Sequence, residues 1–402
     1  MTKSPRIHYM DALRVLTMIM VIAFHSAMAY TTTRASVWYV HDINTNPVFS
    51  YLNLILHSVN MPFFFFVAGF FTKYLHDRYP LKKLIENRLW RVAIPFLFGL
   101  VILIPYHLTG LSMAYFQYHT LHDNSVLLLQ PHMMTVSASD FTLPHILLRF
   151  LNPEYLWFLY YLLLIYVVSL GIYLLAQHPH LAKLKQYFPA VKDTLQSTYG
   201  AIILIIGFIG LLYLSGVTYL ITPEKLGFDV DAFCIYSLFF VYGLSSFPDN
   251  SLISCLRGQR KFISVLLLFT YCAYLSLQYR YLNTPALDTV SLQVLIVILH
   301  GLCTWGSLFF VVGLLMDYCN KPNRVIHYLA DASYWKYLIS LQIVVVCQYL
   351  LIATPLPSGV KFLIVLSVSL GIALLSYHLF VRFTWLGKVL GGPKRTTSTV
   401  SE

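Results

Sequence analysis

Long apolar runs separated by short polar segments dominate this sequence. The run AIILIIGFIGLLYLSGVTYL, at residues 201–220, has the length that an α-helix needs to cross about 30 Å of hydrocarbon. Ten stretches of this kind can be placed along the chain. They cover residues 11–31, 50–72, 92–112, 154–176, 199–221, 230–247, 263–282, 290–316, 333–354 and 360–382. The pattern therefore predicts an all-α, polytopic membrane protein with ten transmembrane helices.

The basic residues between these stretches gather on one side of the predicted membrane. If the N-terminus is cytoplasmic, the cytoplasmic loops and the two tails contain 20 of the 27 Lys and Arg residues. The positive-inside rule then places both termini in the cytoplasm. The same bias accounts for the net charge of +11, so no nucleic-acid partner is expected. A chain that is 58% hydrophobic and only 11% charged is not a soluble domain, and its predicted surroundings are the lipid bilayer.

The whole apolar region reads as one unit. Residues 1–385 are predicted to form a single integral membrane domain, followed by a disordered cytoplasmic tail at 386–402. The long outer loop at 113–153 contains four histidines and is predicted to be solvated, with a small substrate-facing cap as the alternative. The first apolar segment also has features of a secretory signal peptide, because a basic start precedes residues 15–24 and the AMA at 27–29. The sequence leaves open whether this segment is ever cleaved.

The first predicted helix carries polar residues on one face. Asp11, Arg14 and His25 recur at steps of three and four, together with Met18 and Ile22, so they share that face. Arg14 is expected near the cytoplasmic edge, and His25 lies roughly 16 Å further along the helix axis. Ionisable residues at such depth usually face the bundle interior and are functional. The alternative is a polar contact between helices, with Arg14 extending to the lipid headgroups.

Several motifs follow one another in an order that is typical of a known family. They are Arg14 and His25 in an R-x10-H pattern, MPFFFFVAGFF at 61–71, NRLWRVAIPFL at 87–97, EYLWFLYYLL at 154–163 and ASYWKYLIS at 332–340. This ordered set resembles the acyltransferase 3 family of membrane O-acyltransferases. The last motif of that family often ends in His, and Ser340 stands at this position here. This difference concerns the acceptor and the acyl group more than the reaction class.

The resemblance implies a reaction, a compartment and partners. The chain is expected to transfer an acyl group, acetyl or succinyl, from a cytoplasmic acyl-CoA to a hydroxyl of a periplasmic or envelope glycan. Its place would be the bacterial cytoplasmic (inner) membrane, with acyl-CoA as a substrate and with no permanently bound cofactor and no metal. A hydroxyl attacks a thioester poorly until its proton is removed, and histidine titrates near the working pH. His25 is therefore the predicted catalytic base.

Arginines near the cytoplasmic face are the candidates for binding the acyl donor. Arg88 and Arg91 lie three residues apart in the inner loop at 73–91, which contains six Lys and Arg residues. On a helix they would share a face, and their planar guanidinium groups can grip phosphate. Arg14 is the third candidate for donor binding. The alternative is that these charges only follow the positive-inside rule.

Five further residues are candidates for a supporting role. Asp11 would hold Arg14 in place, and Glu154 would pair with a catalytic group. His57 enters from the outer edge to a depth similar to that of His25, so it would orient His25 or bind the acceptor. Trp157 and Tyr337, together with Tyr334, are candidates for stabilising the oxyanion. For each of these residues, ordinary packing or an interface position is the alternative.

Two other functional classes fit ten membrane spans. In a transporter or flippase of an anionic solute or a glycan intermediate, Arg14 and His25 would line a conduit. In a non-catalytic scaffold, the polar face of the first helix could be neutralised without harm. The basic inner loop and the R-x10-H pattern favour the enzyme over both.

Overall fold

The computed structural model describes most of the predicted membrane domain, namely residues 6–33, 38, 40–101, 153–178, 186–223, 225–284 and 289–387. Every regular element within these residues is a helix, and no strand occurs among them. Three predicted segments lie wholly or largely outside the described residues. They are the end of the third span (102–112), the outer loop up to residue 152, and residues 388–402 of the tail.

Thirteen α-helices have both of their ends within the described residues. They are α1 (His8–Met28), α2 (Pro47–His76), α3 (Leu81–Arg88), α6 (Trp157–Gln177), α7 (Tyr187–Leu195), α8 (Thr198–Leu214), α9 (Val230–Ser245), α10 (Ser251–Leu256), α11 (Arg260–Asn283), α12 (Val290–Tyr318), α13 (Arg324–Asp331), α14 (Ser333–Leu351) and α15 (Ser358–Ser376). Single π turns follow two of them, η1 (Leu89–Ala93) after α3 and η7 (Tyr377–Val381) after α15, and short 3₁₀ turns, η3 (Glu154–Leu156) and η5 (Arg257–Gln259), precede α6 and α11.

Seven of the described helical segments are long and apolar enough to cross a membrane. The pair α7 and α8, bent by 83°, adds an eighth if it forms one span, and α9 is apolar but shorter, with 16 residues. Each of the ten predicted stretches coincides at least in part with a described helix. The all-helical, multi-pass class is therefore confirmed, whereas the count of ten and the cytoplasmic location of the termini stay predictions.

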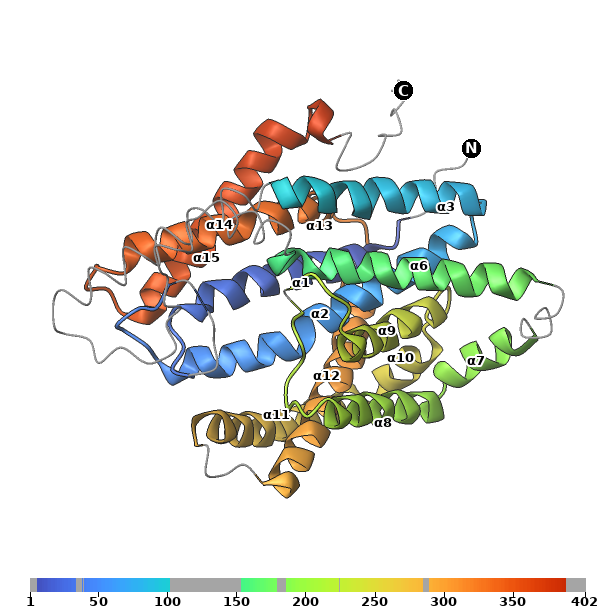
Figure 1. Cartoon of the computed structure of the whole chain (residues 1–402), viewed down its shortest axis with the longest axis horizontal. Coiled ribbons are helices and arrows are strands. Elements are labelled where there is room, and N and C mark those ends of the chain that lie inside the picture. The colour runs from blue at the N-terminus through green and yellow to red at the C-terminus, as the bar shows by residue number, and fades with distance from the viewer. Residues whose placement is uncertain are drawn as a thin grey trace.

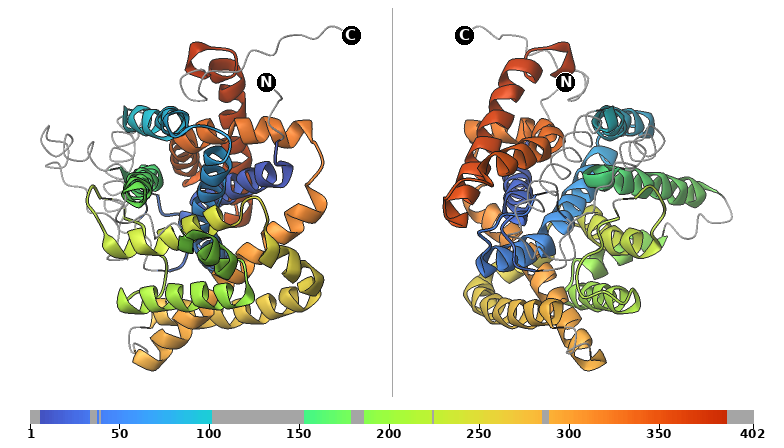
Figure 2. Two further views of the ribbon diagram at one scale, coloured as in Figure 1. Left: turned by 90° about the vertical axis from the view of Figure 1, so that its right-hand side faces the viewer. Right: turned by 60° about the vertical axis from the view of Figure 1, so that its left-hand side comes forward.

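Helices α1 and α2 pack against each other in the middle of the bundle (Figure 1). On one side, α1 contacts α13, α14 and α15, and on the other, α2 contacts α9, α11 and α12. Figure 2 shows the same arrangement from two further directions, with α8 and α11 at the edge opposite α14 and α15. The polar face of α1 can therefore meet α14, which is the contact that forms the candidate site.

Glycines bring α2 and α9 into close contact. A Cβ atom added at Gly69 would lie 2.0 Å from the Phe240 carbonyl oxygen, and one added at Gly243 would lie 2.1 Å from the Phe66 carbonyl oxygen. Both atoms met are backbone, so neither clash can be relieved by a side-chain rotation. Small residues at such crossings allow two membrane helices to approach until their backbones touch.

Candidate functional site

The N-terminal part of α1 is held against α13 by charged groups. The Arg14 guanidinium lies 3.5 Å from an Asp11 carboxylate oxygen and donates a hydrogen bond of 3.2 Å to the Ala330 carbonyl. Arg6 approaches the other Asp11 oxygen at 3.7 Å and pairs with Asp331 at 2.7 Å. Asp11 is buried, so it restrains Arg14 from inside the bundle while Arg6 binds at the edge.

Arg88 and Arg91 come to the same place from a different part of the chain. Arg88 ends α3 and Arg91 lies in the π turn η1, where one extra residue per turn changes the direction of the side chains. The charges of Arg14 and Arg88 both act on Arg91, and Tyr334 of α14 interacts with all three guanidinium groups. The three arginines therefore form one cluster, although Arg14 lies far from Arg88 and Arg91 in the sequence.

Arg88 has donor atoms that no described residue uses. Its guanidinium lies over the Tyr166 ring of α6, with the carbon 5.2 Å from the ring centroid, which is a cation–π contact. The Nε and Nη2 atoms are buried, and within the described parts of the chain they donate no hydrogen bond. Because buried donors without partners are costly, these atoms are suited to receive an anionic ligand.

Lys336 adds a fourth positive charge that the sequence analysis did not assign to the site. It lies in the first turn of α14, is only 1% exposed, and its charge interacts with that of Arg14. No carboxylate among the described residues forms an ion pair with it, although a buried ammonium usually has such a partner. Arg14, Arg88, Arg91 and Lys336 are called the cation cluster below.

His25 lies near the opposite end of α1 and stacks on Trp38. The two ring centroids are 5.4 Å apart and the rings are inclined by only 14°. Trp38 Nε1 donates a hydrogen bond of 2.8 Å to Gln348 Oε1, and the Gln348 amide nitrogen donates to the His25 and Ser26 carbonyl oxygens at 2.9 and 3.1 Å. His25 Nδ1 is buried and has no hydrogen-bond partner among the described residues.

The segment between α1 and α2 that carries Trp38 is packed against the bundle. Trp38 is 7% exposed and Asp42 is 5% exposed. Burial lowers the pKa of the neighbouring His41 below its ordinary value, against the opposing effect of a hydrogen bond with the Trp38 backbone. Burial of the segment therefore favours the neutral form of His41.

His57 does not contact the His25 ring directly. The Phe24 ring neighbours both of them, with its centroid 5.2 Å from that of His25 and 5.7 Å from that of His57. His57 interacts electrostatically with the buried His300 of α12 and lies beside the Tyr219 ring, 6.2 Å between centroids. His57 thus belongs to a neighbouring polar group and shares the Phe24 ring as a neighbour with His25.

The remaining supporting candidates lie at or next to the start of α6, and Tyr337 of α14 is hydrogen-bonded there. Tyr337 donates its hydroxyl to the Tyr155 carbonyl, and Tyr155 donates to the Leu338 carbonyl at 2.6 Å. Trp157 is buried against the Tyr236 ring, with the centroids 5.1 Å apart. Glu154 begins the turn before α6 with a left-handed φ of 43°, which is uncommon for a residue with a side chain. These contacts describe a junction between helices, and the Tyr337 hydroxyl is engaged there.

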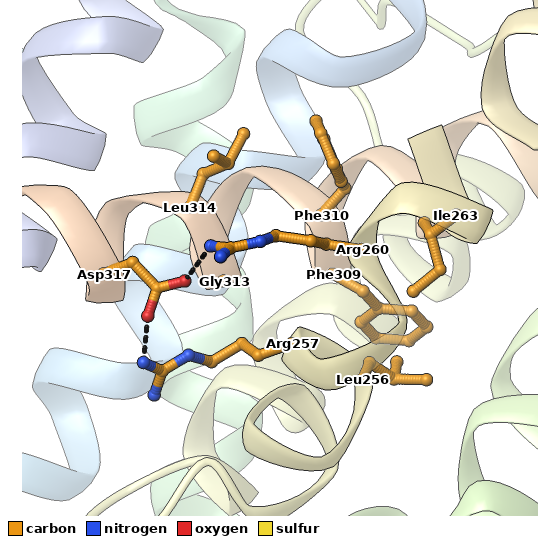
Figure 3. A pocket seen from close by; sticks show the side chains of 9 residues that line it. All are labelled: Leu256, Arg257, Arg260, Ile263, Phe309, Phe310, Gly313, Leu314 and Asp317. Atoms are coloured by element: carbon orange, nitrogen blue, oxygen red, sulfur yellow. Dashed lines mark hydrogen bonds and ion pairs between the residues drawn. The ribbon is translucent and has the colours of Figure 1, made fainter. Parts of the chain in front are cut away.

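A second group of arginines, in contrast to Arg88, forms ion pairs with a carboxylate. Arg257 and Arg260 both bind the carboxylate of Asp317, the latter at 2.6 Å, beside a small pocket between η5, α11 and α12 (Figure 3). Each of these guanidinium groups thus has an acidic partner. In contrast, Arg88 keeps two buried donor atoms that have no partner among the described residues.

The sequence analysis missed Trp38, Gln348 and Lys336. Trp38 stands in a predicted loop, Gln348 is one amide within an apolar span, and Lys336 lies near the start of the span predicted at 333–354. The one signal that could have identified Gln348 and Lys336 is their polarity, because a polar side chain within a span usually faces other helices. Nothing in the local sequence around Trp38 indicates that it stacks on a histidine.

Comparison with known proteins relates the whole chain to one family. The family described as an acyltransferase domain, acyltransferase 3, matches residues 7–378. Glucans biosynthesis protein C of Salmonella gallinarum is 23% identical over 402 aligned residues, which cover 97% of this chain and 95% of the relative. The protein of the same name from Salmonella paratyphi B is 28% identical over 171 residues, or 42% of this chain and 40% of the relative. No solved structure matches.

Proposed function

This chain belongs to the acyltransferase 3 family, and from that premise we propose that it transfers an acyl group from acyl-CoA to a hydroxyl of a periplasmic or envelope glycan. The name of the Salmonella relatives, glucans biosynthesis protein C, supports a glycan as the acceptor. One observation carries the proposal. Arg14 of the cation cluster and His25 occupy opposite ends of the same face of α1, separated by eleven positions, or roughly 16 Å.

The cation cluster suits the donor because coenzyme A carries several phosphates at one end and the thioester at the other. Buried guanidinium donors on Arg88, with Arg14, Arg91 and Lys336 beside them, form charge-assisted hydrogen bonds with phosphate oxygens. The pantetheine arm then extends along α1 toward His25. In this proposal the cation cluster faces the cytoplasm of the inner membrane, as the positive-inside rule requires, and the acceptor arrives from the other side.

His25 acts as the general base in this reaction. It takes the proton of the acceptor hydroxyl, and the oxygen attacks the carbonyl carbon of the thioester. The tetrahedral intermediate collapses with cleavage of the carbon–sulfur bond. The thiolate of coenzyme A leaves and takes up the proton from His25, so the products are the acylated glycan, free coenzyme A and a neutral histidine. No covalent acyl-enzyme is required.

The function is tested by direct transfer in inverted membrane vesicles, whose cytoplasmic face is outside. Radiolabelled acyl-CoA is added outside and an envelope glycan extract is enclosed within. We expect label in the enclosed glycan, and none when the donor is enclosed and the glycan is outside. Counterflow of an anionic solute without acyl transfer would support a transporter, and neither activity would support a scaffold; both outcomes would overturn the proposal.

The donor site makes a separate prediction. Arg88→Ala is expected to raise the apparent KM for acyl-CoA about tenfold or more, because charge-assisted bonds to phosphate are lost. Arg88→Lys should restore it only in part, since a point charge replaces a planar fork. Arg91→Ala should act in the same direction.

Arg260→Ala is the matched control for these variants. It removes one guanidinium that is already paired with Asp317 and lies outside the cation cluster, so the KM for acyl-CoA should stay at the wild-type value. If Arg88→Ala and Arg260→Ala leave the KM equally unchanged, the cation cluster does not bind the donor.

A further inference from the structure

The connection between α1 and α2 is hydrogen-bonded both to the residues that follow α1 and to the residues that precede α15. Its backbone folds back over the end of α1, where Asp42 N–H donates to the Ala29 carbonyl and Asn46 N–H donates to the Tyr30 carbonyl, both at 2.9 Å. Asn44 adds a side-chain hydrogen bond of 3.3 Å to the Leu356 carbonyl, before α15. The segment is therefore shaped by defined contacts with residues far along the chain.

The strongest of these attachments is a buried ion pair. Lys361 Nζ lies 2.6 Å from Asp42 Oδ2, and the two side chains are 0% and 1% exposed. Lys361 also donates to the Ile352 carbonyl at 3.3 Å. Because an ion in such a place is costly without its partner, loss of either residue leaves an uncompensated charge beneath the segment. The pair therefore acts as a latch between the α1–α2 segment and α15.

The latched segment places Trp38 on His25. One face of the imidazole lies against the indole, and the Phe24 ring meets it at 72° with the centroids 5.2 Å apart. Gln348 ties both partners to α14, because its carbonyl accepts from the Trp38 indole while its amide donates to the His25 backbone. Both the ring and the backbone of His25 are thus set by groups outside α1.

We propose that Trp38 and Gln348 are positioning residues that set the orientation of the His25 imidazole, and that the Asp42–Lys361 pair keeps Trp38 in place. This inference rests on the proposed role of His25 as the base. A base must lie within hydrogen-bond reach of the proton that it removes. A displacement of about 1 Å costs on the order of a hundredfold in rate, so a ring held only by its own helix would be a poor base.

The test compares kcat with the KM for acyl-CoA in folded protein. Trp38→Ala is expected to lower kcat by about 10- to 100-fold and to leave the KM near its wild-type value. Trp38→Phe, which keeps an aromatic face against the imidazole, should recover most of the loss. Gln348→Leu keeps the core volume but removes both hydrogen-bonding functions, so it should reproduce the effect on kcat. Trp385→Ala, at an exposed tryptophan, is the control and should leave both constants unchanged.

The latch is tested by reversing its charges. Lys361→Met and Asp42→Asn should each lower kcat in the same way, and the double exchange Asp42→Lys with Lys361→Asp should restore part of it. A purely structural role would lower the yield of folded protein and leave the kcat of the remainder unchanged. The proposal is overturned if folded Trp38→Ala and Gln348→Leu both keep wild-type kcat while His25→Gln is inactive. If His25→Gln transfers acyl groups at near the wild-type rate, the proposed role of His25 as the base fails, and acyl transfer itself is judged by the vesicle assay.

Discussion

Replacing His25 by glutamine is expected to lower kcat for acyl transfer by about 10²- to 10⁴-fold. Glutamine keeps the approximate size and the hydrogen-bonding capacity of histidine, but it cannot take up a proton near neutral pH. The acceptor hydroxyl would then have to attack the thioester without a base. The cation cluster lies at the other end of α1, so binding of the donor should stay near the wild-type level.

The measurement needs transfer rates and donor binding on the same preparation, because a folding defect would also remove activity. His300→Gln is the matched control. His300 is fully buried in the bundle, and its Nδ1 lies 3.1 Å from the Thr218 carbonyl, a contact that a glutamine amide can replace. We expect its kcat per folded molecule to be close to wild type. Near-normal transfer by His25→Gln would show that His25 packs or binds and does not act as the base.

The second large effect is expected at the crossing of α2 and α9. Gly243→Ala places a methyl group where the Phe66 carbonyl oxygen stands, and Gly69→Ala does the same at the Phe240 carbonyl. The helices must separate, which loosens the stacked contact between Phe65 and Tyr236, now 4.7 Å between centroids. We expect each variant to lose about 3 kcal/mol of stability, because repacking of side chains cannot relieve a clash with backbone atoms.

Thermal unfolding in detergent, with the yield of monodisperse protein, checks this expectation. Gly207→Ala and Gly210→Ala in α8 are the controls, because an added Cβ meets nothing within 4 Å at either position. These two should equal or exceed the wild type, since alanine favours the helix. Equal melting temperatures for Gly243→Ala and Gly207→Ala would mean that α2 and α9 are not packed as closely as described.

Much of the architecture could be read from the sequence because a bilayer leaves few choices. A run of about twenty apolar residues must satisfy its backbone internally, and only a helix does so within one segment. The helical period alone placed Arg14 and His25 on one face of α1. It also placed Arg88 near Arg91. It did not predict the π turn η1, which contains Arg91 and follows the α-helix that ends at Arg88.

The amino-acid pattern alone was therefore enough to predict an all-helical, multi-pass membrane protein and the polar face that carries Arg14 and His25. The interaction of the Lys336 charge with that of Arg14 and the stacking of Trp38 on His25 became visible only once the helices were packed together. The cause is the lipid that surrounds the helices. A membrane helix is apolar toward lipid as well as toward its neighbours, so hydrophobic periodicity does not tell which faces pack together. Contacts between distant helices depend on how small and aromatic side chains fit together. These contacts can be identified only when all the helices are packed in one structure.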